Sequence, residues 1–153
     1  MRKYFIHTAL AVLLIAMFGV QLLAPSIAGS SIKASVEIKP KTLNLKENKG
    51  GVITAFIEFT DPSYDVSDID CNNIELHVET APGWAGPISC IVADGVLVAR
   101  FDASEVAGLF RITLGHMQPI PPPKVEYPKS IVVKGTVNGV DFEGSDRIRI
   151  ILP

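Results

Sequence analysis

Apolar and polar residues alternate in short runs along the chain after residue 30, and turn residues separate these runs. Over residues 74–79, the apolar positions Ile74, Leu76 and Val78 alternate with the polar positions Glu75, His77 and Glu79. A period of two is typical of a β-strand that buries one face and leaves the other in water. By this criterion we expect strands over residues 35–38, 42–45, 52–59, 74–79, 88–93, 96–101, 110–114, 130–137, 140–142 and 146–152.

Turn and cap residues support this division of the chain. Asp94-Gly95 and Asn138-Gly139 each separate two of the expected strands. Both dipeptides favour the left-handed backbone of a type I′ turn, so each predicts a two-residue hairpin. Asp102 is followed three residues later by Glu105, which is the pattern of a helix that begins at an acidic cap. We therefore expect one short helix that ends near Leu109.

Many short strands and a single short helix predict an all-β domain over residues 29–153. The expected architecture is an immunoglobulin-like, antiparallel two-sheet β-sandwich. A chain of about 125 residues buries roughly two-thirds of its unfolded surface, so the domain has enough core to stand alone. The immunoglobulin pairing of a disulfide with a buried tryptophan is not expected, because Trp84 lies in a loop of glycine and proline.

The N-terminal segment predicts export. A basic start precedes residues 9–20, which carry no polar side chain, and small residues follow up to Ala28. This is the pattern of a signal peptide over residues 1–28 that is cleaved after Ala28. The alternative is an uncleaved anchor, because residues 4–24 are long enough as a helix to cross about 30 Å of hydrocarbon. In both cases we expect an extracytoplasmic domain, either secreted or tethered at the cell surface by one transmembrane helix.

Cys71 and Cys90 are the two cysteines of the chain, and both lie in the part that we expect to be exported. An even number of cysteines in an oxidising compartment predicts a disulfide. A closed loop of about 20 residues stabilises a fold by roughly 3 kcal/mol in the chain-entropy model. A redox role would need a closely spaced pair or an activated thiolate, and a separation of 19 residues offers neither.

The charge balance excludes some partners. The 14 lysines and arginines include Arg2 and Lys3, so 12 remain after residue 28 against 16 aspartates and glutamates, a net charge of −4. A mildly acidic surface repels phosphate backbones, so we do not expect nucleic acid as a partner. The chain also lacks a polybasic cluster for anionic lipid, which leaves membrane contact only through an uncleaved N-terminal segment.

Four segments of the chain resemble a recurrent immunoglobulin-like β-sandwich module of archaeal and bacterial secreted and cell-surface proteins. They cover residues 36–46, 64–70, 99–106 and 140–148. The resemblance implies an extracytoplasmic module without an assigned activity. Such modules often carry an acidic, calcium-type loop before the strand that ends in Phe-Asp. This chain departs from them, because residues 89–95 contain a single carboxylate, and the disulfide then takes over the role of the staple.

No arrangement of residues points to catalysis. Ser130, His116 and Asp141 have the right types for nucleophilic hydrolysis, but the Gly-x-Ser-x-Gly elbow is missing from the sequence. We therefore expect a protein that is not an enzyme and has no cofactor. An acidic stretch contains the weak metal candidates Asp61, Asp65, Asp68 and Asp70. Its spacing does not match an EF-hand, so solvated turns with Asx-type caps are favoured over weak calcium binding.

Trp84 is the most distinctive single residue. A tryptophan on a glycine- and proline-rich loop either folds back to cap the core, which we favour, or stacks on a ligand such as a sugar ring. The sequence as a whole predicts a non-catalytic structural or interaction module whose partner is a protein or another cell-envelope component. A partner strand could add to an exposed sheet edge. The alternatives are a carbohydrate- or ligand-binding domain that uses Trp84 and Tyr64, and a weak calcium-binding domain.

Overall fold

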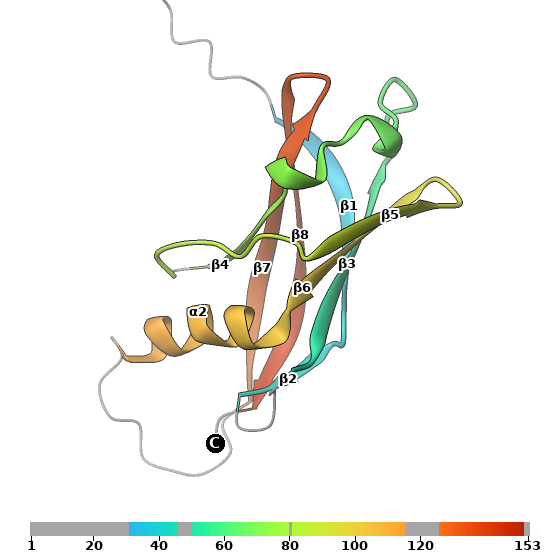
Figure 1. The fold of residues 1–153 in the computed structure, drawn as a ribbon. Helices are drawn as coiled ribbons and strands as arrows, with labels where there is room; N and C mark the ends of the chain where they lie inside the picture. The colour runs from blue at the N-terminus through green and yellow to red at the C-terminus, as the bar shows by residue number, and fades with distance from the viewer. Residues whose placement is uncertain (1–30, 46–49, 80, 116–125, 152–153) are drawn as a thin grey trace, which may run out of the picture.

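Figure 1 shows the fold in a computed structural model, which describes residues 31–45, 50–79, 81–115 and 126–151. The strands are β1 (Ile32–Lys39), β2 (Thr42–Asn44), β3 (Val52–Phe59), β4 (Glu75–Val78), β5 (Ser89–Ala93), β6 (Val96–Asp102), β7 (Glu126–Val137) and β8 (Val140–Ile151). The described helices are α2 (Ala103–Gly115) and the 3₁₀ turns η1 (Val66–Asp68) and η2 (Cys71–Asn73). Among these described helices, none is long and apolar enough to cross a bilayer. The segment 1–28, with the predicted cleavage site at Ala28, lies outside the described residues.

The strands form one hydrogen-bonded path in the order β4-β7-β8-β1-β3-β6-β5, and β2 lies beside β8. The pairs that β8 makes with β1 and β2 are parallel, whereas the other named pairs are antiparallel. The sheet curls, and α2 crosses the lower part of it in Figure 1. A β-rich fold with one α-helix in its described part is therefore confirmed. The prediction of a purely antiparallel arrangement is wrong, because β8 pairs in parallel with β1 and β2.

Strand β1 joins two halves of the sheet. Its residues Ile32 and Lys33 pair with β8, and its residues Ala34 to Lys39 pair with β3. A close approach fixes the crossing, because a Cβ on Gly144 of β8 would lie 2.4 Å from the carbonyl oxygen of Ala34. Only glycine allows two backbones to come this close. The two halves thus meet at Gly144, where no side chain separates the two backbones.

The buried residues of both halves form a single core. Strand β3 shows how the pattern produces it, because Ile53, Ala55 and Ile57 alternate with more exposed neighbours and are at most 1% exposed. Full burial of a large aliphatic side chain contributes about 1.5–3 kcal/mol. The buried side of β7, represented by Ile131 and Val133, belongs to the same core. The curl of the sheet is what allows one core to serve both halves.

The helix α2 corrects two predictions. It continues through Gly115, so the predicted helix end near Leu109 is wrong. Residues 110–114 are helical, so the predicted strand there is wrong as well. Val106 and Phe110 are both buried, and their spacing of four residues is that of one helix face. The predicted acidic cap is confirmed, because the hydroxyl and backbone N–H groups of Ser104 donate to Asp102 and hold the pKa of its carboxyl below the ordinary value.

Both predicted hairpin turns are present. Asp94 and Gly95 have φ values of 53° and 77°, and Asn138 and Gly139 have values of 51° and 78°. Positive φ at both central residues is the requirement of a type I′ turn, so these predictions are confirmed. The strands predicted over residues 140–142 and 146–152 are a single strand, because β8 pairs with β7 without a break from Val140 to Ile151.

Candidate interaction surface

The predicted disulfide is present, and its place in the fold is informative. Cys71 and Cys90 are bonded with their Cα atoms 6.0 Å apart. Cys71 lies in η2, immediately before β4, and Cys90 lies in β5. Strands β4 and β5 are the two ends of the hydrogen-bonded path. The disulfide therefore ties together the two edges of the curled sheet.

The β4 edge of the sheet is covered and polar. The backbone N–H of Leu76 donates to the carbonyl of Ala85, and the N–H of Ala85 donates back to Leu76, both at 2.9 Å. Between the buried residues of β4 stand Glu75 and His77, whose Oε2 and Nε2 atoms are 2.8 Å apart. A strand edge that is hydrogen-bonded and flanked by charge does not recruit another strand.

The β5 edge has neither protection. Among the described residues, β5 pairs only with β6. Ala93 and Val96 flank the two-residue turn and form a hydrogen-bonded pair, so the ladder alternates from there. The N–H and C=O groups of Cys90 and Val92 therefore point away from β6, toward the open side. The five residues of β5 include no charged side chain.

Apolar side chains extend the β5 edge across the outer face of its half of the sheet. Ile91 pairs with Val98 of β6, and Val98 pairs with Phe56 of β3, so the three residues form one row. Ile91 is 59% exposed on this face. Val92 is 45% exposed on the opposite face, because it pairs with the buried Leu97, and Ile88, which precedes β5, is 60% exposed. We call β5 with these three exposed side chains the β5 surface. Large apolar side chains that stay exposed along one strand edge are characteristic of an interaction site.

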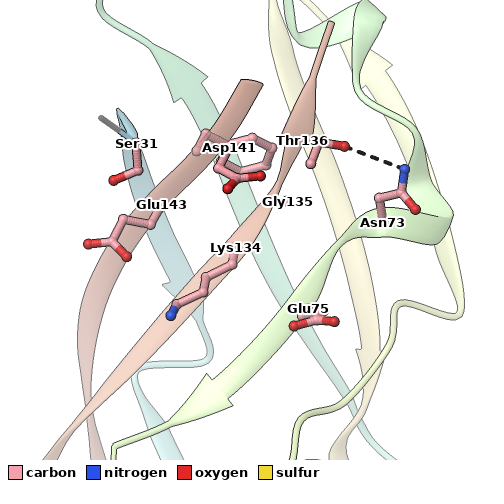
Figure 2. Close-up of a pocket in the computed structure, with 9 residues that line it drawn as sticks. Ser31, Asn73, Glu75, Lys134, Gly135, Thr136, Asp141 and Glu143 are labelled. Atoms are coloured by element: carbon pink, nitrogen blue, oxygen red, sulfur yellow. Dashed lines mark hydrogen bonds between the residues drawn. The ribbon is translucent and has the colours of Figure 1, made fainter. Parts of the chain in front are cut away.

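A row of charges crosses the outer face of the other half. Register places Glu75, Lys134, Glu143 and Lys33 in one row across β4, β7, β8 and β1. Figure 2 shows three of them around a polar hollow of about 320 Å³, where the amide of Asn73 donates to the Thr136 hydroxyl at 3.4 Å. Opposite charges on neighbouring strands attract one another across the sheet. The charged row thus stabilises this half of the sheet and favours exposure of its outer face to water.

The acidic stretch forms turns, as favoured from the sequence. Asp61, Asp65 and Asp70 accept hydrogen bonds from the backbone N–H groups two residues later, those of Ser63, Ser67 and Asn72, and Asp68 accepts one from the side-chain amide of Asn138. The bonds from Ser63 and Ser67 lower the pKa of Asp61 and Asp65. Within the part of the chain that the structure describes, no three histidine, cysteine or acidic side chains are placed to hold a metal ion.

The two predicted ligand-binding aromatics lie in different places. Tyr64 follows the end of β3, and its ring centroid is 5.9 Å from that of Phe59. Trp84 is 52% exposed and is not part of the core, so the prediction that it caps the core is wrong. Its neighbour Gly83 approaches Leu109 of α2. Helix α2 begins beside the opposite end of β3, where Ala103 donates to Gly51. The structure thus does not bring Tyr64 and Trp84 into one platform.

Comparisons of the chain with protein-family models, with curated proteins and with solved structures find no match. The candidate surface therefore stands on its geometry. Sequence reasoning anticipated that a sheet edge could receive a partner strand but did not name the edge. The signal was present, because Ser-Cys-Ile-Val-Ala before the Asp94-Gly95 turn lacks the charged residue that most exposed edges carry.

Proposed function

We propose that this protein is a non-catalytic interaction module that acts outside the cytoplasm and binds an extended protein segment at the β5 surface. The open edge of β5 carries the proposal, because Cys90 and Val92 turn backbone donors and acceptors outward beside the exposed Ile91. Strand addition uses such an edge, in which main-chain hydrogen bonds supply affinity and neighbouring side chains supply specificity.

The compartment and the finer fold belong to the same proposal. The disulfide favours an oxidising, extracytoplasmic setting, and the signal-like segment of residues 1–28 supports secretion or attachment at the cell surface. The two halves that share β1 support a two-layer, immunoglobulin-like sandwich. The resemblance to modules of secreted and cell-surface proteins agrees with this setting.

Site-specific photocrosslinking in intact cells tests the proposal. A photoreactive amino acid at position 91 lies on the β5 surface, and one at position 134 lies on the charged row, as a control with comparable exposure. We expect irradiation to attach a protein to position 91 and not to position 134. Crosslinks at both positions to the same extent, or at neither, would overturn the proposal. Fractionation of the same cells, with N-terminal sequencing, tests export and cleavage after Ala28.

One observation favours a second candidate function. The half-exposed Trp84 is available to stack on a sugar ring. A Cβ at the neighbouring Gly86 would lie 3.5 Å from the indole, so glycine at this position adds no side chain beside the ring. Trp84 is the single tryptophan of the chain, so its fluorescence reports on this site alone. A saturable shift with one glycan of a panel, abolished in Trp84→Ala, would support carbohydrate binding; a flat response across the panel would reject it.

A further inference from the structure

We infer that the occupant of the β5 surface is a second copy of this chain, bound through an antiparallel pair of β5 strands related by a two-fold axis. The inference rests on the proposed function and names the partner for it. Closed two-fold symmetry is the commonest form of protein self-association, and it requires a surface that is complementary to itself. Strand β5 meets this requirement in both its backbone and its side chains.

The backbone permits one register that uses every outward group. Cys90 and Val92 must lie opposite outward groups of the second strand, so Cys90 of each copy pairs with the partner's Val92. Four main-chain hydrogen bonds result from these two pairs. The same register centres the two-fold axis on Ile91, which then faces the partner's Ile91 in a pair without hydrogen bonds. Side chains approach most closely in pairs of that kind.

Charge does not oppose this pairing. Because β5 carries no charged residue, pairing it with the β5 of a second copy brings no like charges together. In the two-fold register, Ser89 lies opposite the partner's Ala93, and Arg100 lies directly behind Ser89 on β6. Arg100 therefore lies two strand spacings, about 10 Å, from the partner's Ala93. None of the five residue pairs between the two β5 strands contains a charged side chain.

Size and shape set the expected strength. The hairpin of β5 and β6 projects from the body of the domain in Figure 1, so a second copy can approach its edge. Five residues on one strand bury less than the roughly 1,600 Å² of a standard interface. We therefore expect a reversible dimer with a dissociation constant in the micromolar range, and a higher effective affinity where copies are concentrated at one surface.

A charge-swap experiment on the exported protein, purified from expressing cells, tests the inference. Ile91→Lys and Ile91→Glu each place two like charges face to face on the axis, so each should raise the dissociation constant at least about tenfold in sedimentation equilibrium. An equimolar mixture of the two variants places Lys opposite Glu, and it should recover the affinity of the unmodified protein. Ile91→Thr, which is neutral and β-branched, is the matched control and should weaken the dimer far less.

The outcomes separate the inference from the proposed function. Recovery in the mixture supports the two-fold pair, whereas dimers that form equally in both single variants, or fail to recover when mixed, overturn it. A protein that is monomeric up to millimolar concentration also overturns it. The proposed function then survives if position 91 still crosslinks to a different protein, and it fails together with the inference if position 91 crosslinks to nothing. Circular dichroism and melting curves confirm that each variant is folded.

Discussion

The two ends of the sheet have opposite surfaces. Strand β4 is hydrogen-bonded to Ala85 on its outer side and carries Glu75 and His77. Strand β5, by contrast, pairs only with β6 within the described part of the chain and carries no charged residue. The faces behind these edges differ in the same sense, because the charged row runs from Glu75 and the apolar row from Ile91. Edges that must stay single are protected by coverage and charge. The lack of protection at β5 is the basis for the binding site that we propose there.

The largest effect is expected from removing the disulfide, because it ties the two ends together. Replacement of Cys71 and Cys90 by alanine should lower the free energy of unfolding by about 3 kcal/mol, the value for a loop of roughly 20 residues. Reduction of the unmodified protein should lower its free energy of unfolding by a similar amount, and its melting temperature with it. An unchanged melting temperature in both cases would show that the core alone holds the two ends in place.

The crossing of β1 and β8 offers the next test, because both halves depend on it. Gly144→Ala places a Cβ 2.4 Å from a backbone oxygen and from Val36, and overpacking of this kind costs about 1–3 kcal/mol. Gly108→Ala in α2 is the control, since nothing lies within 4 Å of its Cβ and alanine favours a helix. Urea unfolding should show a lower free energy of unfolding for Gly144→Ala and a slightly higher one for Gly108→Ala. Equal midpoints would contradict the close crossing.

Asp146 strengthens the same crossing in a pH-dependent way. It accepts hydrogen bonds from the backbone N–H groups of Ile38, at 2.6 Å, and Arg147, at 2.7 Å, and it pairs with Lys41. Burial raises the pKa of this carboxyl, but the bond and charge of Lys41 and the two backbone bonds together hold it below its ordinary value of 3.8. A carboxyl whose folded-state pKa is lowered contributes stability above the unfolded-state pKa and loses it as the pH falls through the folded-state pKa.

Asp146→Asn should therefore lower the free energy of unfolding by about 1 kcal/mol at pH 7. The difference from the unmodified protein should begin to shrink below about pH 4 and vanish once the carboxyl is protonated in both states. Unfolding curves between pH 2 and 7 measure this difference. A difference that stays constant down to pH 2 would show that Asp146 acts through packing and not through its charge.

The smallest effect distinguishes the two outer faces. Lys134→Glu brings three carboxylates into the charged row, and like charges directly opposite one another destabilise a sheet by about 0.2–1 kcal/mol. The loss should fall as salt is added, because exposed charges are screened. Lys134→Gln, the neutral control, should lose less and show little dependence on salt. A loss of stability in Lys134→Glu that does not depend on salt concentration would mean that the row does not act through charge.

The sequence predicts local elements better than their neighbours in the sheet. Residues 52–59 are a strand with the predicted bounds, because alternation and flanking turns are both local signals. Residues 110–114 were predicted as a strand because Phe110, Ile112 and Leu114 alternate, yet Phe110 also lies one helical turn after Val106. Short apolar runs fit both periods, and packing of α2 against the core decides between them.

The candidate surface was only partly accessible to sequence reasoning. The composition of β5 shows that it lacks charge, but whether an edge is open depends on which segments pair with it. Ala85 pairs with Leu76 although the intervening loop carries no strand pattern, and this contact covers β4. Trp84 precedes that contact and is exposed, against the predicted cap. Pairing across the sheet is a tertiary property, so the sequence pattern alone does not assign the open edge.

Amide hydrogen exchange, measured as protein concentration is raised, tests the open β5 edge and its pairing most directly. The amides of Cys90 and Val92 should exchange rapidly in dilute protein and slow down by at least tenfold as copies associate. The amide of Leu76, which is bonded to Ala85, should exchange slowly throughout. Slow exchange of Cys90 and Val92 in dilute protein, or fast exchange at every concentration, would contradict this account of the β5 surface.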